Sequence, residues 1–112
     1  MWAQIAQIDV LRSLSYTSIT GAYAAVGAAF GFSPRLICIT NNTNGDMLFS
    51  NDGVNDKLFI PKNAFKLFDI ATNKGGMDGI WCLPIGTQIY VKQSTAATSG
   101  AVYVELIYGA DT

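Results

Sequence analysis

The chain has 112 residues, of which half are hydrophobic and only 13% are charged, and its formal net charge is −1. This length fits one domain, and the few charges form no run of either sign, which argues against nucleic acid and anionic membranes as partners. Because so small a domain leaves much apolar surface outside its core, we expect a subunit of an assembly. A tightly packed sandwich with a Ser/Thr/Asn-rich exterior is the alternative.

The first residues differ from the rest, so we predict an N-terminal arm over residues 1–9 and a folded domain over residues 10–112. Trp2, Ile5 and Ile8 recur at every third position with Gln between them, which fits one helical turn or an extended arm. An extended arm would span about 30 Å and reach a neighbouring subunit. Leaving a Trp side chain in water is unfavourable, which favours docking of the arm over fraying.

The N-terminal segment also lacks the basic flank and the long apolar stretch of a signal peptide. No apolar run in the chain reaches the length of a membrane-spanning helix. We therefore expect a protein that is made in a cytoplasm and is not exported by the signal-peptide route.

Short segments rich in β-branched and aromatic residues, separated by turn residues, fill most of the remaining chain. We interpret each segment as a strand. The stretch 21–32 is rich in Ala and Gly and is either a bulged strand or a loop. Apart from this stretch, the expected strands are, in chain order, residues 10–19, 35–41, 46–50, 57–60, 64–70, 80–83, 87–92 and 101–108.

Two turn dipeptides predict how consecutive strands pair. Asn44-Gly45 separates strands 35–41 and 46–50, and Asn-Gly between two such strands is the strongest short-range signal for a hairpin. Asp52-Gly53 predicts a second hairpin, with strand 57–60. Together the two hairpins would form a meander.

Alternation along the later strands predicts which residues enter the core. Ile89 and Val91 share one face of strand 87–92. Strand 64–70 is apolar on both faces, which predicts burial between layers or against a partner. Strand 101–108 has Val102, Val104 and Leu106 on one face and Tyr103, Glu105 and Ile107 on the other. Strand 64–70 has Phe65 and Leu67 on one face and Phe68 and Ile70 on the other.

These patterns, with no helix-length amphipathic segment after residue 9, predict the fold class. We expect an all-β protein with a single antiparallel β-sandwich or jelly-roll-like domain. It would contain about seven to eight short strands, preceded by the N-terminal arm.

The residue types that catalysis needs are scarce. The chain has no His, which removes the usual general base and the commonest metal ligand. Glu105 is the only Glu, and most Asp residues adjoin turn signals, where Asp is favoured for local hydrogen bonding. We expect no enzyme, no catalytic residues and no cofactor. A carboxylate site would need two of the following to converge: Asp46, Asp52, Asp56, Asp69 and Asp78.

The stretch 51–56 contains oxygen ligands that suit a calcium ion. It lacks the spacing and the closing Glu of an EF-hand loop, and a hairpin turn explains the same residues. We therefore expect no metal site.

Cys38 lies in an apolar run and Cys82 follows Trp81, as buried reduced thiols often do. A Cys38–Cys82 bridge is the alternative, which a reducing compartment disfavours.

The aromatic residues are the remaining candidates for binding. Tyr90 and Tyr103 each lie opposite the inferred core face of their strand, so we expect both to be exposed. Exposed aromatic side chains on a sandwich serve either protein contacts or sugar stacking. The predicted partner-binding residues are Trp2, Ile5, Ile8, Tyr90 and Tyr103.

A series of motifs spans nearly the whole chain. In order they are SYTSI at 15–19, PRLICIT at 34–40, NNTNGDMLFSNDG at 41–53, FKLFD at 65–69, LPIGTQIYVK at 83–92 and TSGAVY at 98–103. Together these motifs resemble a family of small structural proteins of tailed phages. In size and order the chain is most similar to the capsid decoration, or staple, proteins of short-tailed phages of the epsilon-fifteen type.

The resemblance implies a β-sandwich that forms a homodimer on the outside of an icosahedral head and ties neighbouring major capsid protein subunits together. The expected location is therefore the capsid surface of the virion. A neck or tail-adaptor subunit of a phage is the alternative within the same class. A glycan-binding β-sandwich module is the alternative from another class.

Overall fold

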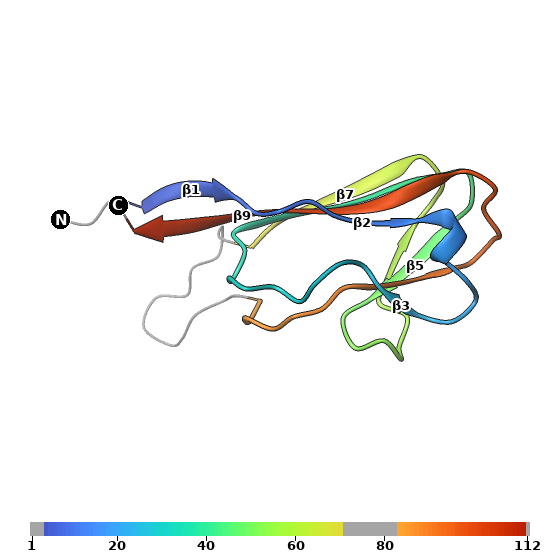
Figure 1. The fold of residues 1–112 in the computed structure, drawn as a ribbon, viewed down its shortest axis with the longest axis horizontal. Helices are drawn as coiled ribbons and strands as arrows, with labels where there is room; N and C mark the ends of the chain where they lie inside the picture. The colour runs from blue at the N-terminus through green and yellow to red at the C-terminus, as the bar shows by residue number, and fades with distance from the viewer. Residues whose placement is uncertain (1–3, 71–82, 112) are drawn as a thin grey trace.

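The computed structural model describes residues 4–70 and 83–111, which form nine strands and one 3-10 turn (Figure 1). All strand pairs are antiparallel and lie in two sheets, so the prediction of an all-β sandwich is confirmed, with nine strands instead of seven to eight. No helix among these residues is long and apolar enough to span a membrane. The elements are β1 (Gln4–Ile8), β2 (Arg12–Ser15), the 3-10 turn η1 (Tyr16–Ser18), β3 (Ala24–Ala25), β4 (Leu36–Thr43), β5 (Met47–Ser50), β6 (Leu58–Ile60), β7 (Ala64–Asp69), β8 (Tyr90–Gln93) and β9 (Gly100–Asp111).

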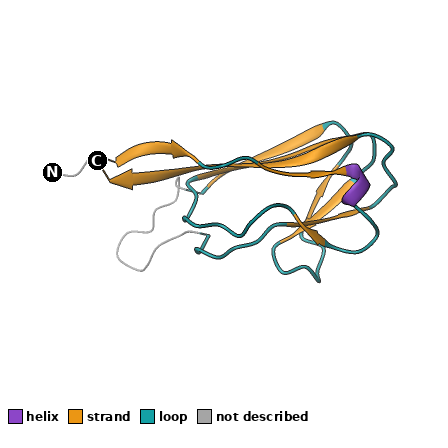
Figure 2. Ribbon diagram, in the orientation of Figure 1, coloured by secondary structure: helices purple, strands orange, loops and turns teal. Residues whose placement is uncertain are grey.

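Two sheets enclose the core. Sheet A has the strand order β1-β9-β4-β7, with β2 also paired to β9, and sheet B has the order β3-β8-β5-β6. Figure 2 shows long strands in one layer, whereas loops make up much of the other. The buried hydrophobic side chains of the core are Ile19, Val26, Phe30, Ile37, Ile39, Met47, Phe49, Ile60, Ile89, Val91, Val102, Val104 and Leu106.

The longest strand, β9, organises sheet A. It pairs with β4 along one edge and with β1 and β2 along the other. Its alternate residues Val102, Val104 and Leu106 are all buried, as are Ile89 and Val91 on the facing sheet, so these predicted inward faces are confirmed. The alternation succeeds as a predictor here because a strand paired on both edges must direct its side chains to the two faces in turn.

The predicted hairpin at Asn44-Gly45 is wrong, and so is the meander. The dipeptide does connect β4 to β5, but β4 belongs to sheet A and β5 to sheet B. Both edges of β4 are occupied by β7 and β9, so β5 has no edge of β4 to pair with. The buried Asn41 side chain stabilises this crossing, since its Nδ2 donates to the carbonyl oxygens of Gly45 and Ile60, each at 2.9 Å.

The second predicted hairpin is confirmed, because β5 and β6 pair around Asp52-Gly53 with Met47 opposite Ile60. The chain then returns to sheet A, where β7 pairs with β4 alone. The alternative that strand 64–70 is buried between layers is therefore wrong, whereas burial against a partner stays a prediction. As an edge strand β7 packs Phe68 against the core and leaves Phe65 and Leu67 exposed.

The N-terminal arm is extended, not helical, over the residues that the structure describes. Residues 4–8 form β1, which lies beside the end of β9 (Figure 1). The expected strand 10–19 is shorter than predicted, because β2 begins at Arg12 and ends where Ser15 caps the 3-10 turn. Of the stretch 21–32, only Ala24–Ala25 pairs as a strand, and within the expected strand 80–83 the residues 80–82 lie outside the described part of the chain.

A β-bulge separates β1 from β2. Ile8 pairs with Ile107 and Arg12 with Val104, so residues 9–11 stand opposite the two residues 105–106. The extra residue reverses the side-chain alternation. Ile8 therefore points away from the core, whereas Arg12 points into the sandwich.

Arg12 is the principal buried charge, with 8% of the residue exposed. Its Nε donates to the Ala28 carbonyl oxygen at 2.7 Å, and its Nη2 donates to the Ala29 carbonyl oxygen at 3.3 Å. Its Nη1 forms an ion pair with Asp9 at 3.0 Å, and the guanidinium lies 5.2 Å from the centroid of the Phe30 ring. The Arg12 side chain thereby attaches the loop after β3 to the bulge.

Replacing Arg12 should destabilise the chain strongly. Arg12→Met leaves the Asp9 carboxylate without its ion pair, so we expect the free energy of unfolding to fall by about 2 kcal/mol or more in urea titrations. Arg12→Lys should be nearly as harmful, because an ammonium lacks the planar fork of donors. Lys57→Met is the control, since its exposed ion pair at 3.9 Å should contribute no more than about 1 kcal/mol. Equal losses in the Met variants would contradict the assigned role.

Gly100 at the start of β9 provides a second test. Its φ is +94°, and a Cβ there would collide with the Asn42 carbonyl oxygen and lie 2.8 Å from the Thr43 Cα. Gly86 has nearly the same φ, +93°, but open space around it. In the same titrations, Gly100→Ala should reduce the free energy of unfolding by about 1–3 kcal/mol more than Gly86→Ala. Matching losses would show that backbone strain alone is responsible.

Candidate interaction surface

The candidate interaction surface is the side of sheet A that faces away from the core. Alternation along β4, β7 and β9 places every second residue there, and the register aligns them in rows, with Cys38 opposite both Leu67 and Glu105. Ile8 joins this side through its pairing with Ile107. The outer face of sheet A comprises Ile8, Leu36, Cys38, Thr40, Phe65, Leu67, Asp69, Tyr103, Glu105 and Ile107.

Large apolar side chains are exposed on both edge strands of the outer face of sheet A. Ile8 on β1 is 79% exposed, and Phe65 and Leu67 on β7 are 63% and 60% exposed. Exposed apolar side chains grouped on one face mark sites of protein contact. Between them lies a depression of about 280 Å³ lined by Ile8, Leu36, Cys38, Leu67, Glu105, Leu106 and Ile107.

Glu105 is the one charged residue that lines this depression. It lies on β9 between Tyr103 and Ile107, with Cys38 opposite on β4. The side chain is exposed, and no hydrogen bond or ion pair joins it to another described residue. A carboxylate therefore lies in a depression whose other lining residues are apolar or Cys.

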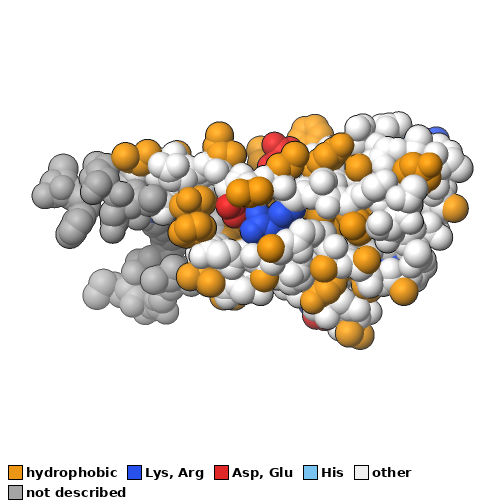
Figure 3. All heavy atoms as spheres, viewed as in Figure 1, with side chains coloured by type: hydrophobic (Ala, Val, Ile, Leu, Met, Phe, Trp, Pro, Cys, Tyr) orange, Lys and Arg blue, Asp and Glu red, His pale blue; other side chains and the backbone are white. Residues whose placement is uncertain are grey.

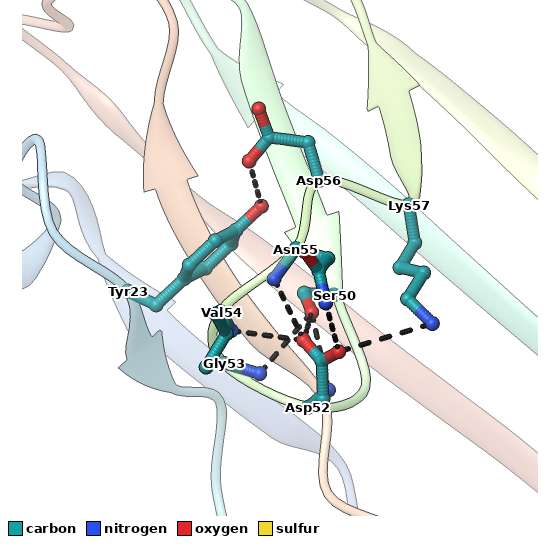
Figure 4. A network of polar contacts seen from close by, with 8 residues as sticks. All are labelled: Tyr23, Ser50, Asp52, Gly53, Val54, Asn55, Asp56 and Lys57. Carbon is teal, nitrogen blue, oxygen red and sulfur yellow. Dashed lines mark hydrogen bonds and ion pairs between the residues drawn. The ribbon is translucent and has the colours of Figure 1, made fainter.

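On the corresponding side of sheet B, the loop 51–56 is held in shape by a network of polar contacts that also reaches Tyr23 (Figure 4). Gly53 lies over the Tyr90 ring, where an added Cβ would be 3.5 Å from three ring carbons. Tyr23 Oη donates to Asp56 Oδ1 at 2.6 Å, and Lys92 Nζ lies 2.9 Å from the same oxygen. These contacts hold the loop against β8, so the two sides of the sandwich differ in what they offer a partner.

Asp52 holds the loop 51–56 in shape (Figure 4). Its Oδ1 accepts hydrogen bonds from Ser50 Oγ at 2.6 Å and from the backbone N–H groups of Val54 and Asn55 at 2.8 and 2.9 Å. Its Oδ2 accepts one from Asn55 Nδ2 at 2.9 Å. Both carboxylate oxygens are thus engaged by donors of the same turn, as the hairpin interpretation of this stretch expects. No cluster of three acidic or Cys side chains suited to a metal occurs in the described residues.

The same hydrogen bonds shift the acidity of the loop residues. The Ser50 hydroxyl, followed by the backbone N–H groups of Val54 and Asn55, holds the pKa of Asp52 well below its usual range. Hydrogen bonds from Tyr23 and Lys92 lower the pKa of Asp56. Burial, followed by the hydrogen bond to Asp56, raises the pKa of Tyr23. The loop is therefore anchored by ionised carboxylates near neutral pH.

A cleft lies between the β-bulge and the loop after β3. Its volume is about 530 Å³, and Arg12 and Asp9 lie among exposed Val10, Leu11 and Phe32. Figure 3 shows basic side chains beside acidic ones near the middle of the face in view, with hydrophobic side chains around them. The polar groups of the pair already bond each other and the backbone, so we interpret this cleft as structural.

The five predicted partner-binding residues are only partly brought together. Trp2 lies outside the described residues. Ile5 and Ile8 are exposed on β1, but only Ile8 belongs to the outer face of sheet A. Tyr90 and Tyr103 were both expected to be exposed, which is wrong, because each is half-buried. Tyr90 lies beneath the loop 51–56 on sheet B, whereas Tyr103 does belong to the outer face of sheet A.

Sequence reasoning missed Leu36, Cys38, Phe65 and Leu67 as surface residues. The signal was present in strand 64–70, whose two apolar faces pointed to burial either between layers or against a partner. Cys38 is a free, half-buried thiol whose Sγ lies 3.8 Å from Thr40 Oγ1, and Cys82 lies outside the described residues.

Acid should test the anchoring role of Asp52. Because the folded chain lowers its pKa below the ordinary 3.8, its contribution to stability is complete well above that value and is lost as the pH falls through the lowered one. Between about pH 6 and pH 2, we expect the melting temperature of Asp52→Asn to fall less than that of the wild type, because Asn cannot be protonated in this range. Parallel melting curves for the two proteins would contradict this role.

Comparison with known proteins places the chain in no family. No protein-family model matches it, and neither does any curated protein or solved structure. The resemblance to phage structural proteins therefore remains a prediction from the motifs.

Proposed function

We propose that this protein is an adhesive structural subunit that binds another protein through the outer face of sheet A. Following the resemblance of its motifs, the proposed role is that of a decoration protein on the capsid surface of a tailed phage. There it would tie major capsid protein subunits together and stabilise the head. Self-association into a homodimer remains a prediction from the same resemblance.

The observation that carries this proposal is the exposed apolar surface of Ile8, Phe65 and Leu67 around the depression in sheet A. Full burial of one such side chain is worth roughly 1.5–3 kcal/mol, so covering three that are more than half exposed supplies a modest interface free energy. When many copies bind to a lattice, their modest interfaces act together, and the combined binding is much stronger than that of one interface.

A binding function also agrees with the distribution of charge. The outer face of sheet A exposes large apolar side chains and few charged groups, and depletion of charge is typical of protein interfaces. On sheet B, in contrast, the polar loop 51–56 covers Tyr90, and Phe59 is 45% exposed. Sheet A thus offers a partner more exposed apolar surface than sheet B.

Binding to phage heads tests the proposal. Purified protein would be mixed with expanded, DNA-filled heads that have been stripped of decoration protein, and sedimentation would count the bound copies. We expect hundreds of copies per head and greater resistance of the heads to heat. Retention on isolated necks or tails at about a dozen copies would favour the adaptor role instead.

A matched pair of variants locates the surface. Leu67→Ser removes an exposed apolar side chain from the outer face of sheet A, and Val54→Ser removes one, 75% exposed, from the loop on sheet B. We expect Leu67→Ser to weaken binding to heads about tenfold, since it removes roughly 1–2 kcal/mol of apolar burial. Val54→Ser should bind like the wild type. Equal affinities of both variants would refute this surface as the binding site.

A further inference from the structure

We infer that the partner of the outer face of sheet A is a different protein that presents a Lys or Arg side chain to Glu105, with apolar side chains around it. This inference rests on the proposed function and specifies the chemistry of the partner. The observations behind it are the position of Glu105 and the distribution of cations over the described chain.

Glu105 occupies the middle of the surface and not its rim. It lies between Tyr103 and Ile107 along β9, and across the sheet Cys38 separates it from Leu67. A partner that covers Leu67 and Ile8 must therefore cover Glu105 as well, because all three line one depression. Removing a carboxylate from water without a compensating charge is strongly unfavourable, so a docked partner has to supply one.

The described part of the chain itself offers no such cation on this face. Arg12 points into the sandwich, where Asp9 and two backbone carbonyl groups engage it. Lys92 lies on sheet B against Asp56. Lys66 pairs with Ile39 and therefore belongs to the opposite side of β7. Among the described residues, therefore, none of these three cations compensates Glu105, which favours a cation from the molecule that docks.

A second copy of this chain fits the surface poorly. Glu105 is the one charged residue that lines the depression, and none of its lining residues is a Lys or Arg. A symmetric contact through the depression would bring two Glu105 carboxylates into one interface, and like charges across an interface suppress pairing. Charge complementarity therefore favours a heterologous partner with a basic group, which orients that partner as well as attracting it.

The test compares charge variants in the head-binding assay. Glu105→Gln keeps the size of the side chain and removes its charge, and we expect it to bind stripped heads about 30-fold more weakly or worse. Glu105→Lys should bind more weakly still. Asp56→Asn is the control, because it removes the same charge from the opposite side and keeps an oxygen for Tyr23. Melting curves of each variant verify that it is folded.

The salt dependence of head binding is a second measurement, which should be the same in the wild type and in Glu105→Gln if Glu105 has only a structural role. Wild-type affinity should fall as NaCl is raised from about 50 to about 500 mM, whereas that of Glu105→Gln should fall less. Cys38 lines the same depression, so alkylation of the peptide containing it should slow when heads are bound.

The possible outcomes separate the two proposals. If Leu67→Ser loses binding while Glu105→Gln keeps wild-type affinity and salt dependence, the basic partner is refuted and the adhesive function stands. If the wild type does not bind heads at all, both proposals fall. If ultracentrifugation shows a dimer that Leu67→Ser dissociates, the surface joins two copies and the heterologous partner is refuted.

Discussion

The pairing of β9 along both of its edges is the constraint on which the rest of this structure depends. With β4 on one side and β1 and β2 on the other, its residues can only alternate between the core and the outer face. Val104 and Leu106 thereby fix the centre of the core, while Glu105 between them is placed at the centre of the exposed surface. One face of β9 thus stabilises the domain, and its other face forms part of the proposed binding surface.

The two outer sides of the sandwich differ in how their apolar side chains are covered. On sheet B, the loop 51–56 folds back over Tyr90 and is held by hydrogen bonds of Asp52 and Asp56. On sheet A no described loop plays this part, and Leu67 of the edge strand remains exposed. A small domain cannot bury all its apolar residues, so the uncovered side is where a partner gains most from contact.

The β-bulge between β1 and β2 joins the core to the candidate surface. One additional residue reverses the alternation, so that Ile8 faces outward and Arg12 inward. Without the bulge, Ile8 and Arg12 would point to the same side of the sheet, because residues four apart in a regular strand share a face. The buried guanidinium then organises the loop after β3 through carbonyl groups that have no strand partner.

The sequence by itself determined the all-β class, the inward residues of β8 and β9, and the hairpin at Asp52-Gly53. These depend on local alternation and turn chemistry, which a few neighbouring residues specify. The failure at Asn44-Gly45, the exposure of Leu67 and the burial of Tyr90 were decided by tertiary structure. Each depends on which strand or loop occupies a neighbouring edge or face, and such long-range pairing leaves no local signal in the chain. The candidate surface is for that reason visible only once β1, β4, β7 and β9 lie side by side.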